Sequence, residues 1–473
     1  MGLTLCNENG EINTPIGVAG CKNVDLLSFM SLGDIGGNNT NDIWGWTDEL
    51  TGKEYVTVGK TNGTAFVDVS DPINPIYLGD LKTKSTQSVW RDIKICDNYA
   101  YIGSEATNHG VQVFDLRKLR GIEYGTSFEA DVIYDSEGTI DLPFFGIPYF
   151  SKSHNLVINE ETKFLYGVGG EPEGLNIVDI SNPLLPKPHG IGVWADGYVH
   201  DAQSVVYHGP DNRYVGKEIV FGSNEKWFSI MDLTNKQNPT VISTLSYSNY
   251  AYVHQGWLTE DHRFFITNDE KDELDGIVSN TTTYIFNVEN LEKPYLTQTY
   301  SSTETSVDHN LYTRDKILYQ SNYKSGLRLL DLSDIESDNV NQIGYFDVPT
   351  GNVSLFSSGS WSNYPYFKSG VVVLTDIQNG VWIVKPRYLS VTASTENLCY
   401  GDNLTIDLTC LVKIDNVSIE NLPETVDFNY TINERSSNIT IDPFPEIDNE
   451  TYNFTVVINN TYRNDLIVTV SNC

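Results

Sequence analysis

The sequence has no run of about 18 apolar residues, the length that a helix needs to cross a bilayer. We therefore expect no membrane span. Only 3 methionines occur among 473 residues, and no alanine-, leucine- or lysine-rich stretch places apolar residues at helical spacing. This pattern excludes a mainly helical protein. Tyrosine (28), phenylalanine (19) and glycine (37) are plentiful, and this composition favours strands and turns.

Basic residues are also scarce. The chain has 30 Lys and Arg against 63 Asp and Glu, which gives a formal net charge of −33. Such a charge repels nucleic acids and anionic membrane surfaces, and it excludes a general nucleic-acid function. Two explanations stay open: an acidic surface suited to salty or extracellular water, or a role in binding cations.

The established catalytic motifs are missing as well. The sequence has no GxSxG elbow, no HExxH and no Rossmann fingerprint. The segment GKT at Gly59–Thr61 ends like a phosphate-binding loop, but Glu54 stands where that loop requires glycine. These absences favour a non-catalytic protein.

The cysteines show no CxxC spacing, so we expect disulfides rather than a structural zinc site. Cys6 and Cys21 flank a short polar loop, and Cys399 and Cys473 bracket the C-terminal segment; these are the candidate disulfide residues. Cys96 lies in an apolar strand and is expected to be a buried thiol. With Cys410, six cysteines allow fifteen connectivities, so the pairing stays open.

Two further features bear on where the protein resides. The first residues, MGLTLCNENG, lack the basic start and apolar core of a signal peptide. We therefore expect either that the sequence is that of the mature chain with an added Met, or that export uses another route. Glycosylation sequons crowd the tail, which favours an extracellular or cell-surface glycoprotein. The candidate glycosylation sites are Asn38, Asn62, Asn280, Asn352, Asn403, Asn416, Asn429, Asn438, Asn449, Asn453 and Asn459.

An internal repeat organises the chain. A short apolar run followed by an acidic or polar residue recurs as TAFVDV, VQVFDL, LNIVDI, FSIMDL, TYIFNV, LRLLDL and VWIVKP. Two strands precede each run, and a turn and a fourth strand follow it, with the copies roughly 45 to 65 residues apart and no helix between them. Four strands per unit are typical of a β-propeller, here of seven blades.

The seventh unit has no fourth strand of its own. Its third strand ends at Pro386, whereas the N-terminal FMSLGD (Phe29–Asp34) is similar to the IYLGD of the first unit. We therefore predict that the N-terminus completes the last blade and removes an exposed sheet edge. The segment from Lys118 to Phe150 interrupts the rhythm, and we interpret it as a fourth strand plus a long surface loop.

From Tyr388 onward the repeat stops, and alternating strands such as NLTIDLT, YNFTVVIN and DLIVTVS follow. These indicate a small immunoglobulin-like β-sandwich that acts as a stalk or an assembly contact. The predicted architecture is thus all-β: a seven-bladed propeller over residues 1–386, closed by an N-terminal strand, and a sandwich over residues 387–473.

Long strings of the propeller segment, among them NGTAFVDVSDPINPIYLGDL, GLNIVDISNPL, HDAQSVVYHGPD and HQGWLTEDHRFF, resemble the choice-of-anchor B family, which is related to the LVIVD-repeat propellers. The resemblance covers roughly Cys6 to Pro386. It implies an exported propeller carried at the cell surface, and it implies no particular biochemical activity. The C-terminal anchor usual in that family is not evident before Cys473.

Four histidines occupy equivalent positions at the start of the first strand in successive units: His154, His200, His254 and His309. Because first strands line the channel of a propeller, equivalent residues form a ring, and carboxylates at the second-strand ends crowd the same mouth. The candidate metal-binding cluster consists of these histidines with Glu105, Glu225 and Asp269; Glu171, Glu270, Asp376, Asp92, Asp201 and Asp308 are expected nearby.

Such a cluster is suited to calcium, zinc or copper, or to acid–base catalysis. The alternative is that these side chains satisfy one another and channel water through hydrogen bonds. The acidic loop Asn268–Gly276 also has calcium-type ligands, but it does not match the EF-hand spacing, so we expect a solvated loop. Tryptophans in the first strands are expected to be blade packing or a carbohydrate-stacking surface: Trp44, Trp46, Trp90, Trp257 and Trp361.

The leading hypothesis is a surface module that binds protein or glycan, or that serves as a structural scaffold. The rival hypothesis is a metal-dependent hydrolase or oxidase that uses the channel histidines. A third is a self-assembling subunit of an extracellular filament or virion surface.

Overall fold

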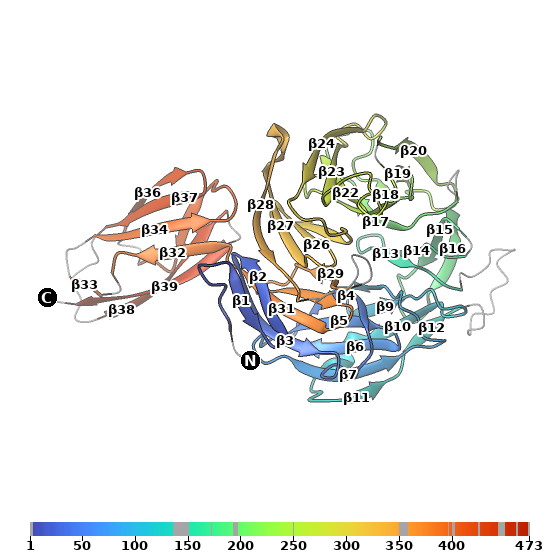
Figure 1. Ribbon diagram of the computed structural model, residues 1–473, viewed down its shortest axis with the longest axis horizontal. Coiled ribbons are helices and arrows are strands. Elements are labelled where there is room, and N and C mark those ends of the chain that lie inside the picture. The colour runs from blue at the N-terminus through green and yellow to red at the C-terminus, as the bar shows by residue number, and fades with distance from the viewer. Residues whose placement is uncertain are drawn as a thin grey trace. The chain divides into compact units, whose positions relative to one another are not determined.

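The structure, a computed structural model, describes residues 3–135, 151–171, 173–192, 197–248, 250–349, 358–395, 397–399, 403–423, 426–442, 450–459 and 462–471 (Figure 1). It is all-β, as predicted, with two short 3-10 helices at Leu116–Leu119 and Ile335–Ser337. The chain divides into two compact units, one made of residues 1–314, 318–330 and 344–385, and the other of residues 315–317, 331–343 and 386–473. No helix in the described ranges is long and apolar enough to cross a membrane.

Consecutive strands of the repeat region form antiparallel sheets, each ordered from an inner to an outer strand. The first sheet contains β4 (Thr40–Thr47), β5 (Glu54–Lys60), β6 (Gly63–Asp68) and β7 (Ile76–Lys82). The second contains β8 (Ile93–Cys96), β9 (Tyr99–Ile102), β10 (Val111–Asp115) and β12 (Val132–Tyr134). The third contains β13 (Asn155–Asn159), β14 (Phe164–Val168), β15 (Leu175–Asp179) and β16 (Lys187–Gly192).

The next sheets repeat this plan and follow one another in chain order in Figure 1, from green to orange. The fourth contains β17 (Asp201–Val206), β18 (Glu218–Ser223), β19 (Phe228–Asp232) and β20 (Thr240–Leu245). The fifth contains β21 (Val253–Leu258), β22 (Phe264–Asp269), β23 (Thr282–Asn287) and β24 (Tyr295–Ser301). The sixth contains β25 (Leu311–Arg314), β26 (Ile317–Ser321), β27 (Leu327–Asp334) and β28 (Asn339–Phe346).

The polar residue of each repeat has a structural role. Its side-chain oxygen accepts a hydrogen bond from the backbone N–H two residues later and so caps the turn toward the fourth strand. The donor and acceptor residues, at N–O distances of 2.8–3.1 Å, are Ser70 and Asp68, Arg117 and Asp115, Ser181 and Asp179, Thr234 and Asp232, Glu289 and Asn287, and Ser333 and Asp331. The seventh copy has Lys385 instead, and no fourth strand follows it in the sequence.

The hydrophobic cores lie between neighbouring sheets. Phe66 of the first sheet stacks on Phe114 of the second at a centroid distance of 4.6 Å, and Phe221 of the fourth stacks on Phe265 of the fifth at 5.4 Å. Such aromatic pairs contribute roughly 0.5–1.5 kcal/mol each beyond the burial of their area. Each sheet is thus stabilised by its neighbours on both faces. This packing fixes the position of its inner strand relative to the inner strands of those neighbours.

The last repeat is completed by the N-terminal part of the chain. The seventh sheet has the order β29 (Ser360–Tyr364), β30 (Val372–Asp376), β31 (Gly380–Pro386) and β3 (Val24–Ser31). The Leu32 N–H donates to the Asn379 carbonyl at 3.0 Å. Leu27 and Met30 are buried in one cluster with residues of both the seventh and the first sheets. The closing strand begins earlier than the predicted Phe29–Asp34 segment, and Phe29 lies against Trp382 at 4.1 Å.

Two additions to the repeat were not anticipated in this form. The hairpin of β1 (Glu11–Thr14) and β2 (Gly17–Lys22) extends the sixth sheet beyond β28, and the predicted Cys6–Cys21 disulfide ties its base. The irregular segment after Lys118 contributes β12 as the expected fourth strand and also β11 (Thr126–Phe128), which pairs parallel with β7. Residues 136–150 of that segment lie outside the described residues.

The second unit contains two further sheets. One has the order β32 (Leu389–Ala393), β34 (Leu404–Cys410), β37 (Ser436–Ile441) and β36 (Phe428–Asn433); the other has β33 (Asn397–Cys399), β39 (Tyr462–Ser471), β38 (Glu450–Ile458) and β35 (Val417–Glu420). In β34 buried and non-buried residues alternate, so one face of its sheet is apolar. Cys96 and Cys410 are buried free thiols, whereas Cys473 and the side chain of Cys399 lie outside the described residues, and their pairing stays a prediction.

We predict that Gly380→Ala disrupts the closing strand. Gly380 has φ +133°, and an added Cβ would lie 2.1 Å from the Met30 carbonyl oxygen, which is backbone and cannot rotate away. We expect a loss of roughly 2 kcal/mol or more, seen as a lower unfolding midpoint and as faster proteolysis of the N-terminal segment. The control is Gly52→Ala, where φ is +70° and nothing lies within 4 Å; it should cost about 1 kcal/mol. Equal losses in both variants would contradict the proposed clash.

Candidate metal centre and the layers beside it

The four predicted histidines form a continuous arc. The ring centroids of His154 and His200 are 4.3 Å apart, those of His200 and His254 are 4.4 Å apart, and those of His254 and His309 are 4.3 Å apart. Trp361 continues the arc at 4.6 Å from His309. Each histidine lies at the start of an inner strand, and the common register of those strands brings together residues that are about fifty positions apart in the sequence.

Backbone carbonyls fix the orientation of these imidazoles. His200 Nδ1 lies 2.9 Å from the His254 carbonyl oxygen, and His309 Nδ1 lies 2.6 Å from the Trp361 carbonyl oxygen. Because a carbonyl only accepts hydrogen bonds, Nδ1 must carry the proton in both rings, and Nε2 keeps a free lone pair. His254 sits beside the His309 carbonyl in the same way, although its Nδ1 makes no hydrogen bond of regular geometry.

Glu270 stands between two of these rings. Its Oε2 lies 3.9 Å from His254 Nε2, and its Oε1 lies 3.7 Å from His309 Nε2. Both distances are too long for hydrogen bonds. Donors of one tetrahedral zinc ion, each about 2.1 Å from the metal, lie roughly 3.4 Å apart, so the observed spacing is close to that of a shared ion. Ligand atoms of His254, Glu270 and His309 all lie within 4.8 Å of one another.

Burial keeps three histidines of the arc uncharged. It lowers the pKa of His309 to about 3 and that of His200 and His254 well below the ordinary value, so all three rings are neutral, the form that binds metals. Burial also raises the pKa of Glu270 to about 7, against a lowering effect of the Tyr323 hydroxyl, which donates to Oε1 at 2.6 Å. The histidines of this cluster therefore need not lose a proton to act as ligands.

A cavity of about 480 Å³ opens over the arc. Its size lies within the range of roughly 300–1,000 Å³ typical of small-molecule sites. Residues other than the arc that line it include Trp90, Tyr198, Tyr252, Lys271, Tyr323 and Trp361.

The predicted carboxylates have different fates. Glu105 accepts a hydrogen bond at 2.5 Å from His154 Nδ1, whereas Nδ1 of His200 and of His309 is bonded to a backbone carbonyl. Asp269 was predicted to belong to the metal-binding cluster, but the structure gives it another role. Its oxygens accept hydrogen bonds from the Tyr247 hydroxyl and from the backbone N–H groups of Ala251 and Tyr252, so it caps a turn. Glu225 forms a backbone bridge with Val253 and is not part of the three-residue cluster. The neighbouring Glu270 takes the place assigned to Asp269.

A carboxylate layer lies one position further along the inner strands. Lys94 Nζ lies 2.6 Å from Asp92 Oδ1 and 3.4 Å from Asp42 Oδ2, and it also acts on Asp201. Burial raises the pKa of Asp201 to about 7 and that of Asp42 well above its ordinary value. Burial also acts to raise the pKa of Asp92, but Lys94 and hydrogen bonds bring it below the ordinary value. Lys94 is therefore the cation that interacts with all three carboxyl groups of this layer, those of Asp42, Asp92 and Asp201.

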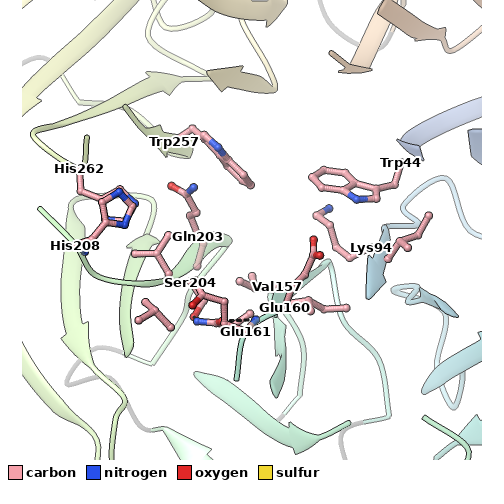
Figure 2. Close-up of a pocket in the computed structure, with 16 residues that line it drawn as sticks. Trp44, Lys94, Val157, Glu160, Glu161, Gln203, Ser204, His208, Trp257 and His262 are labelled. Atoms are coloured by element: carbon pink, nitrogen blue, oxygen red, sulfur yellow. Dashed lines mark hydrogen bonds between the residues drawn. The ribbon is translucent and has the colours of Figure 1, made fainter. Parts of the chain in front are cut away.

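The opposite ends of the inner strands surround a second cavity, of about 260 Å³ (Figure 2). The rings of Trp44 and Trp257 line this cavity, and both contact Tyr312, at 5.7 and 5.1 Å. Lys94 Nζ lies 4.8 Å from the Trp44 ring centroid. Figure 2 shows the polar side chains of Gln203, Ser204, Glu160 and Glu161 among the other lining residues, together with Val157.

The LVIVD repeat model matches residues 52–83 and 163–188, and this repeat is associated with β-propeller folds. These two segments cover β5–β7 and β14–β16. The predicted relation to LVIVD-repeat propellers is thereby confirmed, whereas the choice-of-anchor B assignment stays a prediction. No curated protein matches the sequence.

The solved structures that are similar to this chain include the following three. A functionally unknown protein from Desulfotomaculum acetoxidans has a TM-score of 0.43 and 11% identity over 70% of this chain and 92% of its own. The extracellular domain of a putative one-component system from B. thetaiotaomicron has a TM-score of 0.45 and 11% identity, over 99% of this chain and 62% of its own. The periplasmic gluconolactonase of Pseudomonas aeruginosa has a TM-score of 0.46 and 8% identity, over 73% of this chain and 98% of its own. These values give no information about the activity of this chain.

We predict that Lys94→Met destabilises the protein because it leaves the carboxylate layer without its cation. Removing one partner of a buried pair costs roughly 3–5 kcal/mol, whereas Lys53, whose side chain is 52% exposed, is expected to contribute less than about 1 kcal/mol through its pair with Asp68. Lys53→Met is therefore the matched control. The double variant K94M/D92N should recover part of the loss in chemical denaturation. A K94M midpoint equal to that of K53M would show that the layer is already neutral.

Proposed function

We propose that the chain is an exported seven-bladed β-propeller, closed by β3, with an immunoglobulin-like sandwich over residues 387–473. The inner-to-outer order of every repeat sheet and the cluster shared by the first and seventh sheets support the closed ring. The two four-stranded sheets after Pro386 and the one-sided burial of β34 support the sandwich.

The function that the geometry supports best is binding of a divalent transition-metal ion, zinc in the first place, by His254, His309 and Glu270. The observation that carries it is the pair of Nε2 atoms held 3.9 and 3.7 Å from one buried carboxylate. Two imidazole nitrogens and one carboxylate oxygen suit zinc or copper, whereas calcium prefers an all-oxygen site. Three protein ligands would leave a coordination position open toward the cavity, as in catalytic zinc sites.

A metal ion at this position would polarise an oxygen of a molecule in the cavity. The protein's own contribution is orientation: the Trp361 carbonyl sets the His309 ring, and the Tyr323 hydroxyl sets Glu270. This geometry favours the metal-dependent hypothesis over a purely structural scaffold, and the reaction class stays open between hydrolysis and oxidation.

The test is titration of chelator-treated full-length protein with ZnCl2 and with CuSO4 by calorimetry, together with elemental analysis. We expect one transition-metal ion per chain, and a loss of roughly 100-fold or more in affinity for H254A and H309A. His208→Ala, an exposed histidine at the other cavity, is the matched control and should bind normally. Binding that survives H254A and H309A, or no binding by the wild type, would overturn the proposal.

A second candidate function is recognition of a sugar at the cavity of Figure 2, the glycan-binding role that the sequence suggested. A pyranose ring has one apolar face and a rim of hydroxyl groups. The cavity offers both kinds of surface, because the rings of Trp44 and Trp257 line it together with the polar side chains of Gln203 and Glu160. Its volume, about 260 Å³, suits one sugar ring rather than a larger ligand.

Saturation-transfer NMR with a panel of neutral, amino and acidic monosaccharides tests this second candidate. We expect W257A and W44A to weaken the bound sugar by roughly 10-fold or more, since stacking on aromatic rings supplies much of such affinity. Trp90→Ala is the control, because Trp90 is 43% exposed and lines the histidine cavity. Absence of any sugar signal, or an equal effect of W90A, would count against the site.

An extracellular, glycosylated state at a cell surface is also part of the proposal. Asn280 and Asn459 donate through Nδ2 to the carbonyls of Ser302 and Lys413, at 2.8 and 2.7 Å, and are poor acceptors for a glycan. Asn62 and Asn416 are half-buried, and Asn352 and Asn449 lie outside the described residues. The exposed sequons are Asn38, Asn403, Asn429, Asn438 and Asn453. Binding of a protein partner and self-assembly into a filament or virion surface stay predictions.

A further inference from the structure

His154 differs from the other histidines of the arc in the partner of its Nδ1 atom. His154 Nδ1 lies 2.5 Å from Glu105 Oε1. The Nδ1 atoms of His200 and His309 lie beside backbone carbonyl oxygens instead. A carboxylate accepts a hydrogen bond as a carbonyl does, so Nδ1 of His154 carries the proton and Nε2 keeps its lone pair. Unlike a carbonyl, the carboxylate also stabilises the imidazolium that forms when Nε2 takes up a proton.

The fold fixes this pair of side chains in place. His154 stands immediately before β13, and its N–H donates to the Val168 carbonyl at 2.9 Å. Gly169, with φ +64°, packs so closely that an added Cβ would lie 2.3 Å from His154 Cβ. The Glu105 N–H donates to the Trp90 carbonyl at 3.3 Å. Backbone contacts therefore hold the segments that carry the ring and the carboxylate.

The pair lies on the same cavity as the proposed metal centre. His154 and Glu105 line the cavity of about 480 Å³, as do the three residues of that centre. The side chain of His154 is 12% exposed and that of Glu105 is 29% exposed, so both are accessible from the cavity. A positive charge on His154 acts electrostatically on His254 and on Glu270. The group of possible metal ligands, His254, Glu270 and His309, does not include His154, which leaves its Nε2 for a proton.

We propose that His154 is the general base for hydrolysis of a small carboxylic ester in this cavity, and that Glu105 is its positioning residue. Nε2 takes a proton from water while the water oxygen forms a bond to the ester carbonyl carbon. The bond from that carbon to the leaving oxygen then breaks, and Nε2 returns the proton to the departing alkoxide. The products are a carboxylic acid and an alcohol. This inference rests on the proposed metal centre, which would polarise the carbonyl oxygen.

The chemistry of the cavity favours ester hydrolysis. A base with a free lone pair is what activation of water requires, so the pair of His154 and Glu105 favours hydrolysis over oxidation. One acid–base residue serves an ester more readily than an amide, because an alkoxide is a better leaving group than an amide anion. Trp90, Tyr198 and Tyr252 also line the cavity and offer aromatic rings to the apolar part of such a molecule.

The experiment measures hydrolysis of p-nitrophenyl acetate by the zinc-loaded full chain. We expect turnover above that of the zinc salt alone, and a slower rate in D2O because a proton moves in the transition state. His154→Ala should lower kcat by roughly 100-fold or more with little change in KM, and added imidazole should restore part of the rate. His189→Ala, on the outer strand β16 and outside the lining of this cavity, is the matched control and should behave like the wild type.

A second measurement needs no metal. Diethyl pyrocarbonate acylates imidazole nitrogens that keep a lone pair, and mass spectrometry locates the label. We expect the metal-free chain to be labelled at His154. Glu105→Gln keeps a hydrogen-bond acceptor but removes the charge, so it should slow this labelling and lower kcat while zinc affinity stays that of the wild type. No labelling of His154 would contradict its role.

Zinc calorimetry separates this inference from the proposed function. A wild type that binds zinc but hydrolyses the ester no faster than the zinc salt, or an H154A variant as fast as the wild type, would overturn the role of His154 and leave the metal centre intact. Loss of zinc binding in H154A would make His154 a ligand and would also overturn that role. A wild type that binds no zinc would overturn the metal centre, and the inference with it. Should H154A fail to fold, His154→Gln replaces it.

Discussion

The common register of the inner strands is the constraint on which the rest of the structure depends. Backbone ladders hold each inner strand to its own sheet, and packed side chains between sheets hold neighbouring sheets at the same height. Residues at one position of the repeat therefore meet, although about fifty residues separate them in the chain. The histidines stand at the start of the inner strands, carboxylates such as Asp201 follow one residue later, and aromatic residues such as Trp257 follow two residues after that position. The N-terminal strand β3 is part of the seventh sheet, and this pairing joins the two ends of the repeat region.

The chain carries a large excess of acidic residues, and the structure handles the buried ones in distinct ways. Repeat residues such as Asp232 cap turns through backbone N–H groups, and Asp92 pairs with Lys94. Glu270 accepts a hydrogen bond from a tyrosine hydroxyl, and because its pKa is about 7 it is partly protonated at neutral pH. Asp308 has no partner at all. A buried carboxylate that has fewer hydrogen-bond donors and no paired cation attracts a cation more strongly.

Sequence reasoning worked where a local pattern has a direct structural consequence. The repeat predicted the strand order, the missing fourth strand predicted the N-terminal closure, and equal positions predicted the histidine arc. It failed where neighbours in the sequence diverge in space. Asp269 and Glu270 look equivalent, but β22 ends at Asp269, which accepts from backbone N–H groups of a neighbouring turn, whereas Glu270 lies in the turn after the strand and joins the cluster. The hairpin at Cys21 and the strand β11 gave no repeat signal.

The sequence by itself determined the all-β class, the repeat and the set of residues that share one height in the channel, because periodicity of two and a fixed repeat act through the backbone alone. Only the tertiary structure decided which of those residues touch and which protonation state they hold. Tautomers at His200 and His309 depend on carbonyls of the next repeat, and the uncompensated burial of Asp308 depends on a loop from the preceding one. Burial and long-range contact set charge, and neither can be seen in the order of the residues.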